Sequence, residues 1–324
     1  MQRDVIAPLV IAALVALAPF AGQTDYFIHI LVQILLWGFI YTAWSLMGRF
    51  GLVSLGHGAF MGIGAYVTVL LWNFFELTPW IGMPIAVAAA VALAAIVGWP
   101  CVRLRIVGHY FALVTLALTA VVALSIVGLR DITGGSLGLT PNREAAGTSI
   151  YAFQFASKTV FLYVALVLWL IGLFVWRAVD RGMGRYALQA ISSDEDASAS
   201  VGINVGVEKI RIILLSAGLT ALGGAVFGQY QMYINPETVS GIGVSLQIVF
   251  AVVAGGMFVQ LGPTVGAAFT LILAETLRIL IGNEYHAADT TIYGLMLVLF
   301  IIFMPKGILG AVFAGLERAK AKAA

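Results

Sequence analysis

The stretch FGLVSLGHGAFMGIGAY, residues 50–66, carries five glycines in an otherwise apolar segment. Two of them, Gly58 and Gly62, form a Gly-x-x-x-Gly pattern, which lets the backbones of neighbouring membrane helices approach closely. The same pattern recurs twice further along the chain, at Gly224 with Gly228 and at Gly262 with Gly266. The repeats predict a bundle of closely packed helices.

A single histidine, His57, lies between two of these glycines, and two interpretations of it are open. In the first, the segment serves tight helix packing and His57 bonds a neighbouring interior group. In the second, it lines a solute path, because an unpaired polar group in an apolar span costs roughly 2–7 kcal/mol and is often functional. Residues 51–66 and 255–266 are candidates for broken or re-entrant segments. The candidate translocation path comprises Gly56, His57, Gly58, Gly62 and Gly256.

The composition around this stretch is that of a membrane protein. Apolar residues make up 61% of the 324 residues, charged residues 10%, and the mean hydropathy is +1.03; soluble domains are only about 45–50% apolar. A spanning helix needs about 20 mostly apolar residues. The sequence predicts an all-α polytopic membrane protein, a single transmembrane domain over 1–324 with about ten segments: 5–21, 28–47, 55–75, 82–101, 108–129, 158–177, 209–233, 242–258, 264–281 and 291–305.

The distribution of lysine and arginine predicts the orientation. If the segments alternate from an inner N-terminus, 13 of these residues lie on the inner side and 4 on the outer side. Cytoplasmic loops carry the excess of positive charge, so both termini are expected in the cytoplasm. Two loops are long: an outer loop at 130–157, expected to face the periplasm, and an inner, cytoplasmic loop at 178–208.

The inner loop contains GRYALQAISSDEDASASVGIN, residues 184–204. We expect Ser193 to cap a helix whose first turn holds Asp194, Glu195 and Asp196, since serine is a good N-cap and acids favour the positive end of the helix dipole. Gly202 is a natural stop, and RYALQAI predicts another short helix upstream. The element is either a solvated connector or a docking surface.

Several kinds of chemistry have no sequence support. There is no phosphate-binding loop, the four histidines lack metal-ligand spacing, and no Ser-His-Asp arrangement is suggested, so we predict neither an enzyme nor a metal site. The net charge of +2 is too small to indicate nucleic acid. Glu275 and Arg278 are spaced to pair on one helix face. A proton or ion relay would show several spaced acids, which weakens the alternative of a stand-alone secondary transporter or channel.

Taken together and in order, six motifs resemble the inner-membrane permeases of ABC importers for branched-chain and hydrophobic amino acids, the LivM-like subunits in particular. The resemblance runs from about residue 30 to 310 and rests on GLVSLGHGAFMGIGAY, GHYFALVTLAL, ITGGSLGLTP, GRYALQAISSDEDASASVGIN, NPETV and IYGLMLVLFIIFMPKGILG. The chain reads GGMFVQLGPTVGA at 255–267, where the family has smaller residues. The solute stays open among branched-chain amino acids, urea, amides and aromatic acids.

The resemblance implies a fold, a location and partners. The fold would be the inverted-repeat, all-helical type of BtuC-like (type II) importers, in a bacterial inner membrane. The chain would form the translocation path with a second Liv-type permease subunit and receive solute from a periplasmic solute-binding protein near Gly134 and Gly135. Two ATP-binding subunits would hold the ATP, and the permease would have no cofactor of its own. The coupling contact to them would involve Arg185, Ser193, Asp194, Glu195, Asp196, Ala197 and Val201.

Overall fold

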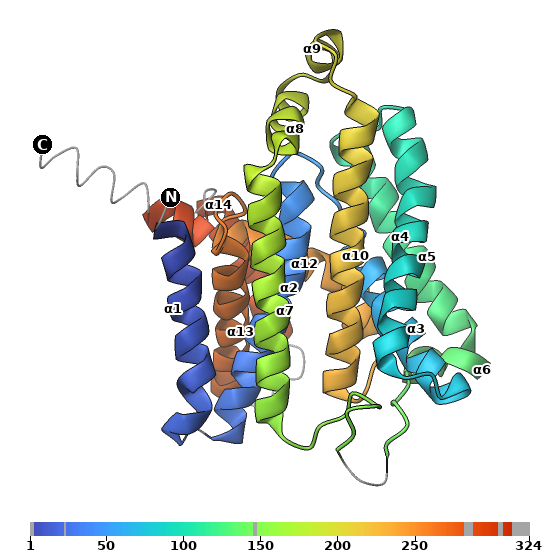
Figure 1. Ribbon diagram of the computed structural model, residues 1–324, viewed down its shortest axis with the longest axis vertical. Helices are drawn as coiled ribbons and strands as arrows, with labels where there is room; N and C mark the ends of the chain where they lie inside the picture. The colour runs from blue at the N-terminus through green and yellow to red at the C-terminus, as the bar shows by residue number, and fades with distance from the viewer. Residues whose placement is uncertain (1–2, 23, 145–147, 282–287, 304–306, 313–324) are drawn as a thin grey trace, which may run out of the picture.

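The computed structural model describes residues 3–22, 24–144, 148–281, 288–303 and 307–312. Their regular structure is helical, with two isolated β-bridges in the connecting segments. Figure 1 shows the long helices side by side in one bundle. The helices in the first half are α1 (Arg3–Leu17), η1 (Ala18–Ala21), α2 (Asp25–Gly48), α3 (His57–Phe75), α4 (Pro79–Arg103), α5 (His109–Gly128), α6 (Arg130–Thr133) and η2 (Gly135–Leu137). Those in the second half are α7 (Lys158–Arg181), α8 (Met183–Ser193), α9 (Glu195–Ser200), α10 (Val205–Gln231), α11 (Pro236–Val239), α12 (Ile242–Gly255), α13 (Gly262–Ile281) and α14 (Ala288–Phe303).

Within the described residues, eight helical segments are long and apolar enough to cross a membrane. The helices α1 and α14 are shorter, at 15 and 16 residues. Each of the ten predicted segments coincides with one of these ten, which confirms the prediction of an all-α polytopic membrane protein. The inverted repeat stays a prediction.

The spanning helices differ in how much of their surface is buried inside the bundle. The helices α2 and α10 lie largely inside the bundle, whereas α4, α5 and α13 are largely exposed. The centre is filled by bulky side chains of α2 and α7, including Phe39, Tyr41, Trp44 and Trp169, each at most 1% exposed. A helix that is apolar on all sides is a buried or a membrane helix, so α2 and α10 form the interior and the outer helices face lipid.

Glycines set the closest approach between α3 and α10. A Cβ added at Gly64 would lie 1.9 Å from the carbonyl oxygen of Ala221, and one added at Gly224 would lie 2.2 Å from that of Met61. A side chain larger than hydrogen cannot fit at either position. Close backbone contact of this kind is what holds helices together in lipid, where tails are as apolar as leucine.

The other predicted glycine pairs also pack closely, each against a different neighbour. A Cβ at Gly62 would lie 2.5 Å from the Cβ of Ser240, in the corner between α11 and α12. One at Gly266 would lie 2.1 Å from the carbonyl oxygen of Ala251 in α12. The packing interpretation of the Gly-x-x-x-Gly repeats is therefore confirmed.

The chain is non-helical between α2 and α3, in the region predicted to be broken. The indole nitrogen of Trp44 donates to the carbonyl oxygen of Ser54 at 2.7 Å. The amide of Leu55 donates to Thr115 Oγ1 at 2.9 Å, and Thr119 Oγ1 donates to the Leu55 carbonyl oxygen at 2.8 Å. Irregular backbone at membrane depth is tolerated only where protein satisfies it, and these side chains do so. A second non-helical link, residues 256–261, begins at Gly256 with φ 108°.

The Gly224 contact generates a stability prediction. The substitution Gly224→Ala should push α3 and α10 apart and lower the free energy of unfolding by about 1–3 kcal/mol, the usual cost of overpacking. The matched control is Gly128→Ala in α5, where an added Cβ meets no atom within 4 Å. The measurement is the thermal unfolding midpoint of the purified chain in detergent. Equal midpoints for the two variants would contradict the packing argument.

Candidate functional site

A two-helix element, α8 and α9, lies at one end of the bundle, where α9 projects beyond the other helices (Figure 1). One face of α8 is held against the bundle by Leu188 and Ile191, which are 4% and 6% exposed, while Tyr186 is 62% exposed. The two predicted short helices are confirmed, and the chain turns after α9 at Gly202, with φ 91°. The inner loop is therefore an ordered structure.

The cap of α9 is Asp194 and not Ser193, which corrects the prediction. The helix α8 continues through Ser193, whose hydroxyl donates to the Gln189 carbonyl oxygen at 3.2 Å. Asp194 is extended, with φ −156° and ψ 115°, and its carboxylate accepts the amide of Ala197 at 2.9 Å. An N-cap residue needs this extended conformation, and a residue still inside α8 cannot adopt it.

The next two acids have partners elsewhere in the chain. The Glu195 carboxylate binds the ammonium of Lys209 in the second turn of α10. The Asp196 carboxylate binds the guanidinium of Arg105 at 2.6 Å. The two pairs differ in burial: the Lys209 and Glu195 side chains are 6% and 22% exposed, whereas those of Arg105 and Asp196 are 65% and 81% exposed. The first pair therefore fixes α9 to α10, and the second contributes little because it is solvated.

The opposite faces of α9 have different environments. The Ser198 side chain is buried and donates to the Asp194 carbonyl oxygen at 2.7 Å. On the outer side, Ala197 and Ala199 are exposed, and Val201 is 77% exposed. The element thus exposes small apolar residues, interspersed with the exposed Asp196 and Ser200, on a base fixed to the bundle.

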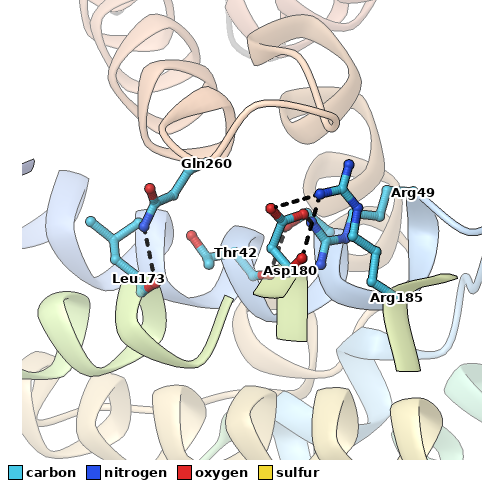
Figure 2. A network of polar contacts seen from close by, with 7 residues as sticks. Thr42, Arg49, Leu173, Asp180, Arg185 and Gln260 are labelled. Carbon is cyan, nitrogen blue, oxygen red and sulfur yellow. Dashed lines mark hydrogen bonds and ion pairs between the residues drawn. The ribbon is translucent and has the colours of Figure 1, made fainter. Parts of the chain in front are cut away.

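Arg185 has an internal partner. Its guanidinium lies 3.1 Å from the Asp180 carboxylate, and Arg49 lies 3.0 Å from the other oxygen of the same group, so one acid binds two cations (Figure 2). Arg49 is 5% exposed and lies between the rings of Phe50 and Trp176, at 4.7 and 4.2 Å from their centroids. This network joins the ends of α2, α7 and α8, a role that the sequence did not indicate for Arg185.

Burial lowers the pKa of the Arg49 guanidinium to about 10, and the Asp180 carboxylate opposes that shift. The side chain is therefore still a cation at neutral pH. Among the described residues its Nε and Nη2 atoms have no hydrogen-bond partner, and the cation is stabilised by Asp180 and by the two aromatic faces.

The predicted path residues are only partly brought together. His57 is fully buried, and its Nε2 lies 2.8 Å from Ser216 Oγ in α10. Because the Ser216 hydroxyl donates its hydrogen to the Ala43 carbonyl oxygen at 2.7 Å, His57 Nε2 must be the donor. The Nδ1 atom has no hydrogen-bond partner within the described segments, and the rings of Trp44 and Phe60 flank the imidazole.

Three of the predicted path glycines surround His57. Gly56 precedes it beside Thr115, the amide of Gly58 donates to Ser245 Oγ at 2.9 Å, and Gly62 packs on Ser240. Gly256 does not join them, because it lies at the other end of α12, about 16 Å along the helix from Ser245 at 1.5 Å per residue. In this conformation the cluster is a packed interior with a hydrogen-bonded histidine at its centre.

The outer loop is ordered by turns and cross-links. Gly134 and Gly135 both have positive φ, at 73° and 58°, a conformation that glycine adopts without strain. Leu139 and Ile234 form an antiparallel bridge that ties the loop to the end of α10. A Cβ at Gly134 would lie 2.0 Å from the Gly138 carbonyl oxygen, so these glycines have a structural role whatever else they contact.

Beside this loop lies a cavity of about 600 Å³ that the sequence did not indicate. It is lined from α2, α7, α10 and the loop by residues that include His29, Arg143, Lys158 and Tyr230. The hydroxyl of Tyr230 lies 2.5 Å from His29 Nδ1. These residues are up to about 200 positions apart in the chain, so no local pattern could have grouped them.

The fold and these sites define a polytopic helical membrane protein with an ordered element at one end of the bundle and an ordered loop with a cavity at the other. The chain belongs to the family described as the branched-chain amino acid transport system/permease component, whose sequence model matches residues 26–304. The resemblance found from the six motifs is thereby confirmed.

Three curated relatives are similar to the chain. The high-affinity branched-chain amino acid transport system permease protein LivM of Escherichia coli K12 is 29% identical over 81% of this chain, which spans 65% of the length of LivM. The corresponding LivH protein of the same organism is 24% identical, with 81% of this chain and 87% of LivH covered. The ribose import permease protein RbsC of Haemophilus influenzae is 22% identical, with 88% and 87% covered. No solved structure matches the chain.

The two ion pairs of α9 provide an internally controlled test. The substitution Lys209→Met leaves Glu195 partly buried without its cation, at a cost of about 1–3 kcal/mol. Since 1.4 kcal/mol is tenfold in an opening equilibrium, the amides of residues 195–200 should exchange hydrogen at least about fivefold and up to roughly 100-fold faster. The control Arg105→Ala removes the exposed pair and should change exchange by less than about fivefold, or 1 kcal/mol. Similar rates in the two variants, read by hydrogen–deuterium exchange mass spectrometry, would rule out the assigned role of Lys209.

Proposed function

We propose that the chain is a permease subunit of an ATP-driven importer that moves a branched-chain amino acid or a related small solute. The observation that carries the proposal is the family match, which covers α2 to α14. LivM and LivH are both named as permease proteins of branched-chain amino acid transport systems. We therefore propose that a second Liv-type permease subunit shares the path, with the cluster around His57 beside it.

In this proposal α9 is the contact for a separate ATP-binding subunit. The exposed Ala197, Ala199 and Val201 offer a surface that a cleft can enclose, and the Glu195–Lys209 pair joins α9 to α10. The helix α10 has 27 residues, about 40 Å at 1.5 Å per residue, and it packs on α3 through Gly224. Movement imposed on α9 by two ATP-binding subunits would thus reach the helices around His57. ATP would be bound by those partners.

The proposed location is a bacterial inner membrane, with α8 and α9 in the cytoplasm and residues 130–157 in the periplasm. A periplasmic solute-binding protein would deliver solute at the outer loop, close to Gly134 and Gly135 and the 600 Å³ cavity. The excess of lysine and arginine on the α8 side supports this orientation.

The alternative, a stand-alone secondary transporter or channel, has less support. The acid Glu275 lies 4.0 Å from Arg278 and accepts a hydrogen bond from Tyr26 at 2.6 Å, so it has partners within the chain. Co-purification with an ATP-binding subunit separates the two classes of function.

The orientation is tested by thiol labelling. Cys101 is the only cysteine in the sequence and is 3% exposed, so introduced cysteines can be read against a low background. A cysteine in place of the exposed Ser193 should resist a membrane-impermeant maleimide in sealed cells and react after permeabilisation. The control Leu137→Cys, at a position 72% exposed in the outer loop, should react in sealed cells. The reverse pattern would overturn the orientation.

The coupling role is tested by Ala197→Arg, which places a bulky cation on the outer face of α9. The variant should insert and fold yet fail to retain its ATP-binding subunit, with ATPase stimulation reduced by at least tenfold, because a charge buried at a contact without a partner costs several kcal/mol. The control Ala197→Ser introduces a residue close in size to the native alanine and without charge, and it should behave as wild type. Normal stimulation and uptake by the arginine variant would show that α9 is only a connector, while the family assignment would stand.

A further inference from the structure

A second cavity, of about 820 Å³, lies beside the end of α7 where α8 begins. Its walls come from α1, α7, α8 and the link between α12 and α13. One part of the lining is cationic, formed by Arg177, Arg181 and Arg185, and another is apolar, with Pro8, Trp176 and Phe258 among its members. The cavity therefore suits a ligand that is anionic at one end and apolar at the other.

The positive charge of this cavity is only partly balanced. Among the described residues that line it there is one acid, Asp180, which already binds Arg49 and Arg185 (Figure 2). Among the residues that the structure describes, neither Arg177 nor Arg181 has an acidic partner. They are spaced i,i+4 and so lie on the same side of α7. Two guanidinium groups thus face a common space, and no acid of the described residues pairs with either of them.

The position of the cavity along the membrane indicates the kind of ligand. The helix α7 is one of the spanning segments, and Trp176 to Arg181 form its last turns. Tryptophan and arginine at the end of a span mark the level of the lipid head groups. The helix α1 contributes Ala7 and Pro8 to the lining, and with Trp176 and Phe258 they provide an apolar wall for a fatty acyl chain.

We infer that this cavity binds an anionic phospholipid of the leaflet next to α8, with its phosphate at Arg177 and Arg181 and an acyl chain along α1. Basic pockets between membrane helices are suited to such head groups. A free phosphate shares the charge but would leave the apolar wall unused. The bound lipid would join α1 to α7 and α8, so the site goes beyond the proposed transport function and does not depend on it.

The test uses the full-length chain purified in detergent and titrated with phosphatidylglycerol or with phosphatidylcholine of the same acyl chains. Native mass spectrometry counts the retained lipids, and we expect saturable retention of phosphatidylglycerol only. The double variant Arg177→Gln/Arg181→Gln should bind it roughly 30-fold more weakly, since each surface cation contributes about a factor of five to six. The variant Arg177→Lys/Arg181→Lys should retain at least part of the binding.

Two controls make the result decisive. Arg103→Gln/Arg211→Gln removes the same charge at the same end of the bundle, from α4 and α10, and should leave retention unchanged. Inorganic phosphate added at millimolar concentration should not displace phosphatidylglycerol. Equal retention of the two lipids, equal loss in both glutamine variants, or displacement by phosphate would each overturn the inference, and the lipid comparison and phosphate competition require no variant to fold.

Discussion

The close contact between α3 and α10 is the constraint on which the rest of the molecule depends. The hydrophobic effect drives apolar surfaces together in water, but it gives almost no driving force between helices in lipid. Membrane helices therefore associate where their backbones can pack in close van der Waals contact. At Gly64 and Gly224 the partner carbonyl oxygens occupy the space of a Cβ. The stretch that contains Gly64 therefore fixes the position of α10, and α10 and the residues just beyond its end in turn contact the projecting helix α9, the cluster around His57 and the outer loop.

Three sites lie along α10. Lys209, near its start, binds Glu195 of α9. Ser216, two turns further on, accepts from His57 and donates to Ala43 of α2. Beyond its far end, Ile234 bridges to Leu139 of the outer loop. One buried helix thus joins the projecting element, the interior histidine and the outer loop. A displacement at one end has a continuous packed route to the other, which is the mechanical property that the proposed importer requires.

Local sequence patterns predicted the structural features that depend on residues close together in the chain. Apolar runs identified ten helical segments, and Gly-x-x-x-Gly spacing identified close packing, because both depend on neighbouring residues. The capping of α9 was assigned one residue too early, since the point at which α8 ends depends on its packing through Leu188 and Ile191. The partners of Glu195 and Asp196 lie 14 and 91 positions away, and Gly256 lies at the far end of α12. Such pairings follow from tertiary structure and leave no periodic signal.

The same limit applies to charge. The sequence counts arginine and lysine on the α8 side as one group that sets orientation, but the structure divides them by function. Arg49 and Lys209 are 5% and 6% exposed, and each is bound to an acid of its own chain, so folding requires their charge. Arg177 and Arg181 pair with no acid in the part of the chain that the structure describes, and they face a cavity at the end of α7. Their charge therefore remains available to anionic lipid head groups at the membrane surface, which basic pockets between membrane helices are suited to bind.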